Sequence, residues 1–543
     1  MDIKMIMVPV GKIGKVAKIN FQAGDRVKKN DELCIVEAGK GSRAIKASAD
    51  AVVEKVLFAD GDEAKTDDVI MVLQETAGNI ENADEKTCDL LIIGGGPGGY
   101  VAAVYAAKKG KKVTLIEQGR LGGTCLNVGC IPTKALVKSA EVVNEIANAE
   151  KFGIIAALNR IDMKKVIEHK NSVVDRLVGG IEFLMEKNDI KVVKGTASFA
   201  DDNTVYVDDK TLTFKNAIIA TGSKITPVNI TGIDSDCVLN STTALSLDTL
   251  PKSVAIIGGG VIGMEFAFIY SHFGVSVTVI EFLDHLLGNV DNEASEFILN
   301  KAAAEGIDVH LNSRVTEIIG DKDGAAVGYV CGDKQDSVLC EKVLVAIGRQ
   351  ANLDALKLEN TTIEIDPRKK AVKVDDHMRT SVGNIYAIGD ATNIIQLAHV
   401  ASHQGMTAVD NILGQEHRIE YNAIPSVIFT DPEVACVGYT AAQALKEGLS
   451  IKESRFDFQS NGKALTMEKG EGFIKLVKDT KKGKIIGATI VGADASALIA
   501  ALTLAIANGL GEQDIIKTVF AHPTTAEVIH EAALGLDIGS LNE

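Results

Sequence analysis

Apolar runs that end in glycine recur along the chain and predict the strands of a parallel sheet. Asp89-Leu-Leu-Ile-Ile93 and Val254-Ala-Ile-Ile257 are two such runs, and each leads into a glycine-rich turn. Continuous apolar runs are typical of strands buried on both faces, as in α/β folds. Similar runs end at Gly222, Gly348 and Gly389. We therefore predict an α/β core in the larger part of the chain.

Residues 1–74 follow another pattern, in which a short β segment, a Gly-Asp turn and an apolar strand occur twice. Lys18-Ile-Asn-Phe-Gln-Ala-Gly-Asp25 recurs at an offset of 37 as Lys55-Val-Leu-Phe-Ala-Asp-Gly-Asp62. The repeat predicts two similar all-β halves. Between the halves, Glu37-Ala-Gly-Lys-Gly41 predicts a hairpin turn with Lys40 at its tip.

Composition narrows the class of protein. The chain has 543 residues, enough for several domains, and its 57 basic and 73 acidic residues give a formal net charge of −16. This balance argues against nucleic acid and anionic membranes as partners, because both require a basic surface. Eight cysteines without any C-x-x-C spacing predict neither a secreted disulfide framework nor a metal site. The apolar run 495–511, which follows Asp494 as a helix cap, predicts a buried helix, and with no signal peptide evident we expect a cytoplasmic protein.

A dinucleotide-binding fingerprint follows the first apolar strand. The order is strand, Gly94-Gly-Gly96-Pro-Gly-Gly99, helix, and a second strand that ends at Glu117. Gly94 allows a tight turn, Gly96 allows the backbone to approach a pyrophosphate, and Gly99 allows close packing of the helix. The helix N-terminus attracts the pyrophosphate, and Glu117 is predicted to accept hydrogen bonds from ribose hydroxyl groups.

The same fingerprint recurs 164 residues later. Gly258, Gly260 and Gly263 repeat the glycines, and Glu281 repeats the acid. The repetition predicts two Rossmann-type domains that bind two dinucleotides. Glu281 would repel a 2′-phosphate, and no Lys or Arg follows it before Lys301, so the second site is predicted to prefer NAD over NADP.

Two cysteines, Cys125 and Cys130, come soon after the first fingerprint. A regular helix would separate them by about 7.5 Å of rise, beyond the roughly 4.4–6.8 Å that a disulfide tolerates. Gly129 permits the departure from helix, and Pro132 suits the first turn of a following helix whose N-terminus stabilises a thiolate at Cys130. A reversible disulfide is favoured over a ferredoxin-type cluster, which needs a third cysteine where Thr133 stands.

Together these motifs resemble those of the pyridine nucleotide-disulfide oxidoreductases over roughly residues 88–543. The resemblance implies that the first fingerprint binds FAD and the second NAD(P), and that Cys125 is the sulfur that exchanges with substrate. It implies that Lys134 lies beside the flavin with Glu265 as its partner. It also implies acid-base catalysis by His522, oriented by Glu527, at the active site of the other subunit of a homodimer. Further cofactor-binding positions are Thr221, Gly222, Gly348, Gly389 and Asp390.

Residues 1–74 resemble the lipoyl/biotinyl carrier domains, which are two-fold β sandwiches with an acceptor lysine at a hairpin tip. Lys40 occupies that position. A biotin acceptor typically has Met on both sides of the lysine, whereas Gly39 and Gly41 flank Lys40, so the resemblance favours covalent lipoate. The other interpretations are a solvated lysine and an unmodified module that docks the enzyme onto a multienzyme complex.

The predicted fold class is a multidomain α/β protein with an N-terminal all-β sandwich, two Rossmann-type domains and a C-terminal α+β domain. Residues 75–87 are polar and lack an apolar period, so they are predicted to be a linker that spans roughly 20 Å root-mean-square. The predicted parts are a lipoyl-like domain at 1–74, a linker at 75–87, an FAD-binding domain at 88–231 that resumes at 355–424, an NAD-binding domain at 232–354, and a dimerisation domain at 425–543.

The predicted reaction is FAD-dependent oxidation of dihydrolipoamide through a Cys125–Cys130 disulfide, with NAD⁺ as the final acceptor. The lipoyl-like domain, the NAD-type second site and the lack of an extra cysteine pair at the C-terminus favour this substrate over glutathione or mercury. The predicted partners are lipoyl-bearing carriers of the E2 type or the glycine-cleavage H type. The alternative is an NAD(P)H-dependent reductase of another disulfide or metal, with the N-terminal domain as a docking module.

Overall fold

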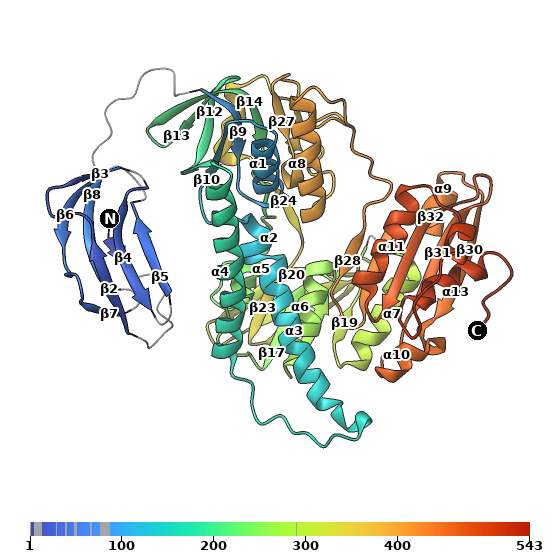
Figure 1. The fold of residues 1–543 in the computed structure, drawn as a ribbon. Coiled ribbons are helices and arrows are strands. Elements are labelled where there is room, and N and C mark those ends of the chain that lie inside the picture. The colour runs from blue at the N-terminus through green and yellow to red at the C-terminus, as the bar shows by residue number, and fades with distance from the viewer. Residues whose placement is uncertain are drawn as a thin grey trace. The chain divides into compact units, whose positions relative to one another are not determined.

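The structure is a computed structural model that describes residues 2–4, 13–28, 30–38, 41–47, 51–65, 68–75, 87–288 and 290–543. The chain divides into two compact units, Met1–Glu85 and Lys86–Glu543, which are described separately (Figure 1). None of the described helices has both the length and the apolar character that a membrane span requires. Within the same residues, no group of three or more His, Cys, Asp or Glu side chains could hold a metal ion.

The first unit is a β sandwich of two four-stranded antiparallel sheets, in the orders β1-β8-β6-β3 and β5-β4-β2-β7. Val16 and Leu33 from one sheet and Val53 and Ile70 from the other are buried in one core. The two-fold all-β architecture predicted from the repeat is confirmed. Its strands are β1 Asp2–Lys4, β2 Ile13–Ile19, β3 Arg26–Val27, β4 Glu32–Ala38, β5 Gly41–Lys46, β6 Ala51–Val56, β7 Glu63–Lys65 and β8 Val69–Glu75.

The sequence repeat of this unit is also a repeat of hydrogen bonds. Asp25 and Asp31 each accept from the backbone N–H three residues earlier, at 2.6 and 2.8 Å. Asp62 and Asp68, at the matching positions of the second half, do the same at 2.7 Å. A side chain that accepts from a nearby backbone N–H stabilises a turn. These four aspartates therefore fix the turns that join the strands.

The predicted lipoate acceptor Lys40 and its neighbour Gly39 lie outside the described residues. The strands before and after them, β4 and β5, pair antiparallel with Ala38 opposite Gly41. Residues 76–86, most of the predicted linker, also lie outside the described part of the chain.

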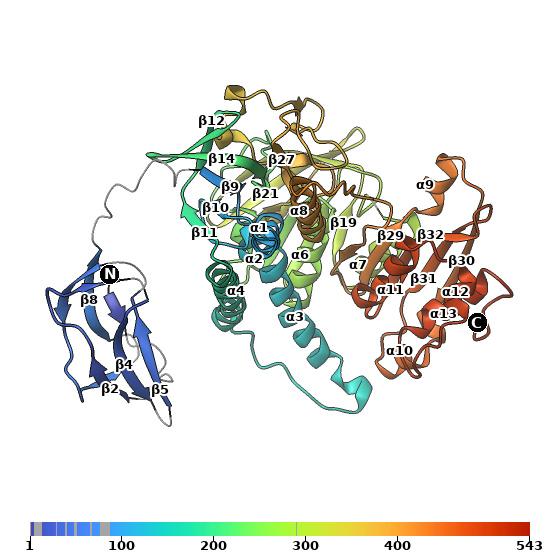
Figure 2. The ribbon, with the colours of Figure 1, turned by 45° about the horizontal axis from the view of Figure 1, so that its top comes forward.

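The second unit begins with a sheet in the order β11-β10-β9-β14-β13-β12, in which β27 also pairs with β14. Strands β9, β10, β11, β14 and β27 run parallel, as the apolar runs predict. Helices α1 and α8 lie side by side (Figure 1 and Figure 2). The elements are β9 Thr87–Ile93, α1 Pro97–Lys108, β10 Val113–Glu117, α2 Gly123–Val128, α3 Cys130–Ala147, α4 Met163–Lys187, β11 Lys191–Lys194, β12 Ala197–Asp201, β13 Thr204–Val207, β14 Lys210–Ile219, β27 Ile385–Ala387, η5 Gly389–Thr392 and α8 Ala398–Ile412.

A second parallel sheet, in the order β16-β23-β17-β18-β19, carries the second fingerprint. Helix α6 begins and ends 164 residues after α1 does, so the two fingerprints open helices of equal length. A short ribbon, β15 with β24, lies where the chain passes between the two sheets, and β20-β21-β22 form an antiparallel meander. The elements are β15 Ser223–Ile225, β16 Val238–Asn240, β17 Ser253–Ile257, α6 Val261–His272, β18 Ser276–Ile280, α7 Asn292–Ala304, β19 Asp308–His310, β20 Ser313–Asp321, β21 Gly324–Cys331, β22 Lys334–Cys340, β23 Lys342–Val345 and β24 Arg349–Ala351.

The C-terminal part is an antiparallel sheet in the order β28-β29-β32-β31-β30, with α11 packed on β29 and β32 and α13 on β30 and β31 (Figure 2). This completes the predicted fold class, which is confirmed. The elements are β28 Ser426–Ile428, β29 Glu433–Gly438, α9 Ala441–Lys446, β30 Ile451–Asp457, α10 Gly462–Thr466, β31 Phe473–Asp479, β32 Lys484–Gly492, α11 Ala495–Ala507, α12 Glu512–Ile516 and α13 Glu527–Gly535.

Helix α11 differs in two respects from the buried, Asp494-capped helix predicted from the sequence. Only one face is buried: Leu502 is inaccessible, whereas the Leu504 side chain is 65% exposed. Asp494 precedes the helix with a φ of 59° and makes no capping hydrogen bond; its Oδ2 accepts from Thr525 Oγ1 at 2.9 Å instead. The apolar composition of this run therefore reflects one face packed on the sheet and one apolar face left uncovered in the single chain.

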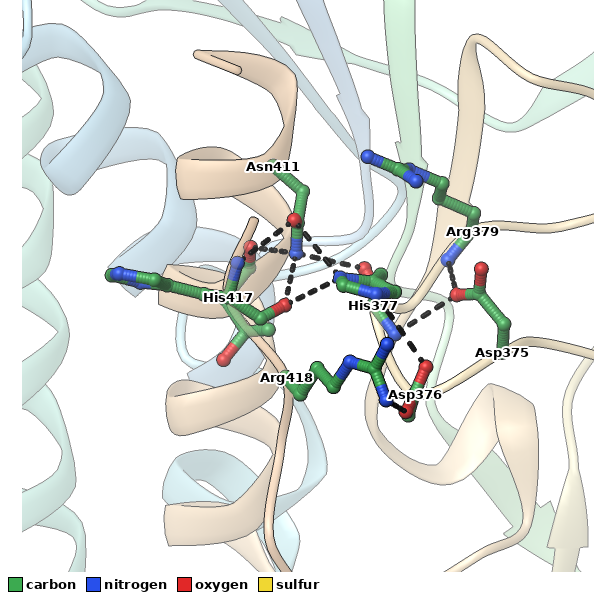
Figure 3. Close-up of polar contacts among 8 residues, drawn as sticks. Asp375, Asp376, His377, Arg379, Asn411, His417 and Arg418 are labelled. Atoms are coloured by element: carbon green, nitrogen blue, oxygen red, sulfur yellow. Dashed lines mark hydrogen bonds and ion pairs between the residues drawn. The ribbon is translucent and has the colours of Figure 1, made fainter. Parts of the chain in front are cut away.

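A polar cluster around the buried side chains of His377 and Asn411 fixes the segment that precedes β27 (Figure 3). The His377 ring lies against α8, and its Nδ1 is 2.8 Å from the His417 carbonyl O. Asn411 Nδ2 donates to the His417 and His377 carbonyls at 2.8 and 3.2 Å. Asp375 accepts from the backbone N–H groups two and four residues later. Since buried polar groups are costly unless they are paired, the cluster anchors the base of the strand that leads to Gly389.

Candidate active site

A cavity of about 2640 Å³ runs through the second unit. Pockets for one small ligand usually measure about 300–1,000 Å³, so this cavity has room for two dinucleotides. It brings together most of the site residues predicted from the sequence. Those that line it are Gly94, Gly96, Glu117, Cys125, Cys130, Lys134, Thr221, Gly222, Gly258, Gly260, Glu265, Glu281, Gly348, Gly389 and Asp390.

The two glycine-rich turns have the same geometry. Gly94 and Gly258 each have a φ of +110°, which favours glycine. A Cβ on Gly99 would lie 1.8 Å from the Gly94 carbonyl O, and one on Gly263 would lie 1.9 Å from the Gly258 carbonyl O. Neither α1 nor α6, both fully described, has a side-chain cap or an acidic residue in its first turn. Their first N–H groups therefore remain available to a pyrophosphate.

Each fingerprint acid braces its own turn. Glu117 Oε2 accepts from the Gly95 N–H and Oε1 from the Gly119 N–H, both at 2.7 Å. Glu281 likewise accepts from the N–H groups of Gly259 and Leu283, at 2.5 and 2.7 Å. A carboxylate offers about four acceptor positions, so both acids keep the capacity to bind the ribose hydroxyl groups predicted for them.

The residues present fit the two dinucleotides implied by the fingerprints. Both uncapped helix N-termini and both acids face one cavity. Thr221 Oγ1 is buried and has no hydrogen-bond partner among the described residues, and the next residue, Gly222, lines the cavity with a φ of +67°. These are the chemical groups that a flavin dinucleotide and a nicotinamide dinucleotide require of a protein.

The two cysteines lie on either side of a helix break. Helix α2 ends before Gly129, and α3 begins at Cys130. A Cβ on Gly129 would lie 2.9 Å from the Thr124 carbonyl O, so the close turn requires glycine. Both cysteines are free thiols, and a hydrogen bond joins their sulfurs. The predicted departure from helix is confirmed, and Pro132 lies in the first turn of α3.

Cys130 is the more acidic thiol of the pair. The hydrogen bond from Cys125 lowers the pKa of Cys130 to about 7, and the charge of Lys134 acts in the same direction, while burial and Glu265 oppose it. Its position as the first residue of α3 adds the field of the helix dipole. The same hydrogen bond, with burial, raises the pKa of Cys125. The electron-rich sulfur is therefore the one at the helix N-terminus.

We expect alkylation of Cys130 in the reduced protein to follow its thiolate fraction. Because its pKa is lowered to about 7, the rate with iodoacetamide is expected to rise with pH through that value. Well below it the rate is expected to fall about tenfold per pH unit, since only the thiolate reacts. Peptide mass analysis identifies the labelled residue. A Cys130 rate that does not change with pH would contradict the assignment of the thiolate.

Lys134 and Glu265 form the ion pair that the family resemblance implies. Lys134 Nζ lies 2.8 and 2.9 Å from the two carboxylate oxygens. Glu265 is buried on α6 and also accepts from the Phe429 N–H at 3.0 Å. The ammonium lies 4.3 Å from the centre of the Phe429 ring. A buried carboxylate needs such partners, so the pair holds α3 against α6 beside Cys130.

His522 and Glu527 are in contact but lie away from the cysteines. His522 Nδ1 is 2.9 Å from Glu527 Oε1, and the Thr524 N–H donates to Oε2 at 3.0 Å, which lowers the pKa of Glu527. A carboxylate on Nδ1 leaves Nε2 free to accept a proton. The His522 side chain is 78% exposed, and neither residue lines the cavity formed by the described part of the chain.

Two further residues, which the sequence analysis did not select, join Asp390 to the redox loop. Asp390 Oδ2 accepts from Ser223 Oγ at 2.6 Å, and Arg349 Nε donates to the same hydroxyl at 2.8 Å. Arg349 Nη2 reaches Thr124 Oγ1 at 3.4 Å. Burial raises the pKa of Asp390 and lowers that of Arg349. The two residues are Ser223 and Arg349. Each follows a glycine that ends a predicted strand, and this position was the signal available in the sequence.

Gln404 is a third residue that the sequence analysis missed. It is fully buried on α8, and its Oε1 accepts from the Gly389 N–H at 2.6 Å. Its Nε2 donates to the hydroxyl of Tyr421, a residue that lines the cavity. Gln404 therefore fixes the turn that presents Asp390. Nothing in the local sequence of α8 distinguishes it.

Models of known families match three parts of the chain. The pyridine nucleotide-disulphide oxidoreductase family matches residues 88–405, and the dimerisation domain of the same family matches residues 424–533. A third model, described as biotin-requiring enzyme, matches residues 4–73.

Known proteins resemble the chain over most of its length. A dihydrolipoyl dehydrogenase of Bacillus subtilis is 43% identical over 451 residues, which are 82% of this chain and 95% of that protein. A dihydrolipoyl dehydrogenase of Haloferax volcanii is 40% identical over 468 residues, which are 84% of this chain and 98% of that protein. Among solved structures, LpdA from Mycobacterium tuberculosis superposes with a TM-score of 0.77 at 26% identity, over 82% of this chain and 99% of its own. The HOCl-induced flavoprotein disulfide reductase RclA from Escherichia coli gives 0.74 at 28% identity, with the same coverage.

Proposed function

Because the chain belongs to the pyridine nucleotide-disulphide oxidoreductase family, we propose that it is a dihydrolipoyl dehydrogenase that oxidises protein-bound dihydrolipoamide with NAD⁺. The observation that carries the proposal is the cysteine pair at a helix break, in one cavity with both dinucleotide fingerprints. The names of the relatives at 40–43% identity support the substrate, and the match of residues 4–73 supports a carrier domain in the same chain.

The chain's own residues perform the thiol chemistry. His522 takes the proton of one dihydrolipoamide thiol, and that sulfur attacks the oxidised pair at Cys125, so that the S–S bond breaks and Cys130 leaves as a thiolate. The second substrate thiol then attacks the substrate sulfur of the mixed disulfide, which closes the lipoamide ring and expels Cys125. His522 passes the first proton to Cys125, which leaves as a thiol, and takes up the proton of the second substrate thiol. The two electrons of the substrate are now held by the cysteine pair.

FAD held at the first fingerprint would supply the two-electron chemistry that links the cysteine pair to a nicotinamide held at the second fingerprint. The adenosine end of FAD would be held by Gly94, Gly96, Gly99 and Glu117. The chain that carries the flavin would be held by Gly389 and Asp390. Gly258, Gly260, Gly263 and Glu281 would hold NAD⁺. Lys134 and Glu265 would lie beside the flavin, and the thiolate of Cys130 would face it.

The proposed active site is completed by a second copy of the chain. His522 is exposed and lies away from the cavity, and the segment that carries it matches a dimerisation domain. In a homodimer, His522 of each chain would serve the cysteines of the other. The uncovered apolar face of α11, which includes Leu504, supports an interface there.

We expect NAD⁺ to be preferred over NADP⁺ by at least about 10²-fold in kcat/KM, because Glu281 places a negative charge where a 2′-phosphate would lie. Steady-state oxidation of dihydrolipoamide with each nucleotide measures the ratio. Equal use of both nucleotides, or a preference for NADP(H), would favour the alternative reductase of another disulfide or metal.

The N-terminal domain is proposed to carry lipoate on Lys40. Tethering a carrier domain to the enzyme raises the effective concentration of its lipoyl group at the active site to roughly the millimolar range. Intact mass analysis of the protein from its native host tests this, with Lys40→Arg as the control. The expected result is a lipoyl increment that the variant lacks; an unmodified mass would support the docking-module interpretation instead.

Lipoyl-bearing carriers of the E2 or glycine-cleavage H type are the proposed partners, and the cytoplasm is the proposed location. The proposed domain limits are 1–74, 75–87, 88–231 with 355–424, 232–354 and 425–543.

A further inference from the structure

Arg349 contacts two parts of the redox site at once. It is the first residue of β24, in the ribbon with β15, and it lines the cavity. Nε and Nη2 donate to the hydroxyl and the carbonyl of Ser223 at 2.8 and 2.7 Å, and Nη2 also reaches Thr124 Oγ1 at 3.4 Å. Thr124 directly precedes Cys125 in α2. One guanidinium thus links the ribbon between the two nucleotide-binding sheets to the helix that carries Cys125.

The other end of this bridge is Asp390. Ser223 Oγ donates to Asp390 Oδ2 at 2.6 Å and accepts from Arg349, so the hydroxyl relays the contact between the two charges. The carbonyl of Arg349 accepts from Gln396 Nε2 at 3.3 Å, which fixes its backbone. Five donors in a planar fork allow Arg349 to bind several acceptors at once, which a lysine could not do.

Four charged or ionisable groups surround Cys130. Cys125 on α2 donates a hydrogen bond, Lys134 on α3 and Arg349 on β24 are cations, and Glu265 on α6 is an anion. Lys134 is paired directly with Glu265, whereas Arg349 reaches Asp390 only through the hydroxyl of Ser223. Arg349 thus has no carboxylate in direct contact among the described residues, and its positive charge would attract a thiolate at Cys130, which follows the α2–α3 break that Thr124 and Cys125 precede.

We propose that Arg349 is a positioning residue of the redox centre, which holds α2 through Thr124 and favours the thiolate of Cys130 by its charge. This inference rests on the proposed role of the two cysteines. According to this proposal, a residue that follows the second nucleotide-binding sheet influences both the position of α2 and the ionisation of Cys130.

The test compares the pH at which Cys130 reaches half of its maximal alkylation rate, in reduced, full-length holoenzyme treated with iodoacetamide. Arg349→Met is expected to move this midpoint upward by about one pH unit, since loss of a nearby opposite charge disfavours the thiolate. Arg349→Lys retains the charge but not the fork, and its midpoint is expected to lie between those of Arg349→Met and the wild type. Arg176→Met, an exposed position on α4 away from the cavity, is the matched control and is expected to give the wild-type midpoint.

A midpoint unchanged in both Arg349 variants, or shifted equally in Arg176→Met, would overturn the inference. If Arg349→Met fails to fold, Arg349→Lys and Ser223→Ala supply the comparison, and wild-type midpoints in both would overturn it equally. The measurement needs neither dihydrolipoamide nor NAD⁺. A wrong substrate assignment would therefore leave this result intact, and the two failures can be told apart.

Discussion

Cys130→Ser is expected to lower kcat for dihydrolipoamide oxidation by NAD⁺ at least about 10³-fold, as removal of an essential catalytic group does in other enzymes. Without this sulfur, Cys125 has no partner with which to form a disulfide, so the substrate thiolate has no S–S bond to break. Serine is close to cysteine in size, and Cys130 faces a cavity, so the fold is expected to persist. The rate of NADH formation at saturating substrates measures the effect.

Cys331→Ser is the control for this variant. Cys331 is an exposed free thiol on β21 and does not line the cavity. Wild-type turnover is expected there, because a thiol outside the redox pair has no part in the electron transfer. If Cys130→Ser kept a rate within tenfold of the wild type, the sulfur pair would not be the route of the electrons.

His522→Gln is expected to lower kcat by about 10²–10⁴-fold, the usual contribution of a positioned acid-base group. Glutamine can still face Glu527 but cannot accept a proton from the substrate thiol. The loss should be smaller at high pH, where the substrate thiol ionises without help. The same assay across a range of pH measures both effects.

Mixing subunits decides on which chain His522 acts. Unfolded Cys130→Ser and His522→Gln proteins, refolded together with FAD, would give about half heterodimers by random pairing. If His522 acts on the cysteines of the other chain, each heterodimer has one site with both defects and one intact site, and about a quarter of wild-type activity returns. No recovery in a mixture shown to contain heterodimers would place His522 and Cys130 in the same chain's site.

Features that repeat in the sequence were predictable because the chemistry is local. The three glycines and the acid of each fingerprint lie within one strand-turn-helix-strand unit, so their spacing alone specifies the turn at Gly94 and again at Gly258. The β repeat of residues 1–74 is predictable for the same reason, since each Gly-Asp turn closes on itself through Asp25 or Asp62.

Features that depend on contacts across the fold were not predictable. The bridge from Asp390 through Ser223 and Arg349 to Thr124 joins four segments that lie far apart in the chain, and no local pattern marks it. The prediction that Asp494 caps the following helix was wrong for a related reason. An aspartate before a helix is typical of a cap, but here tertiary contact with Thr525 takes its carboxylate.

The central claim is that dihydrolipoamide enters at Cys125 and that Cys130 is the sulfur released. Trapping tests it directly: Cys130→Ser and Cys125→Ser proteins are incubated with a lipoamide analogue that has a single sulfur, supplied as its 2-pyridyl disulfide, and the adduct is located by peptide mass. A cysteine thiolate displaces thiopyridone from this probe, and the adduct persists because the analogue has no second thiol to expel the cysteine. We expect a stable mixed disulfide on Cys125 in Cys130→Ser, and little or none on Cys130 in Cys125→Ser. An adduct chiefly on Cys130, or no adduct in either protein, would contradict it.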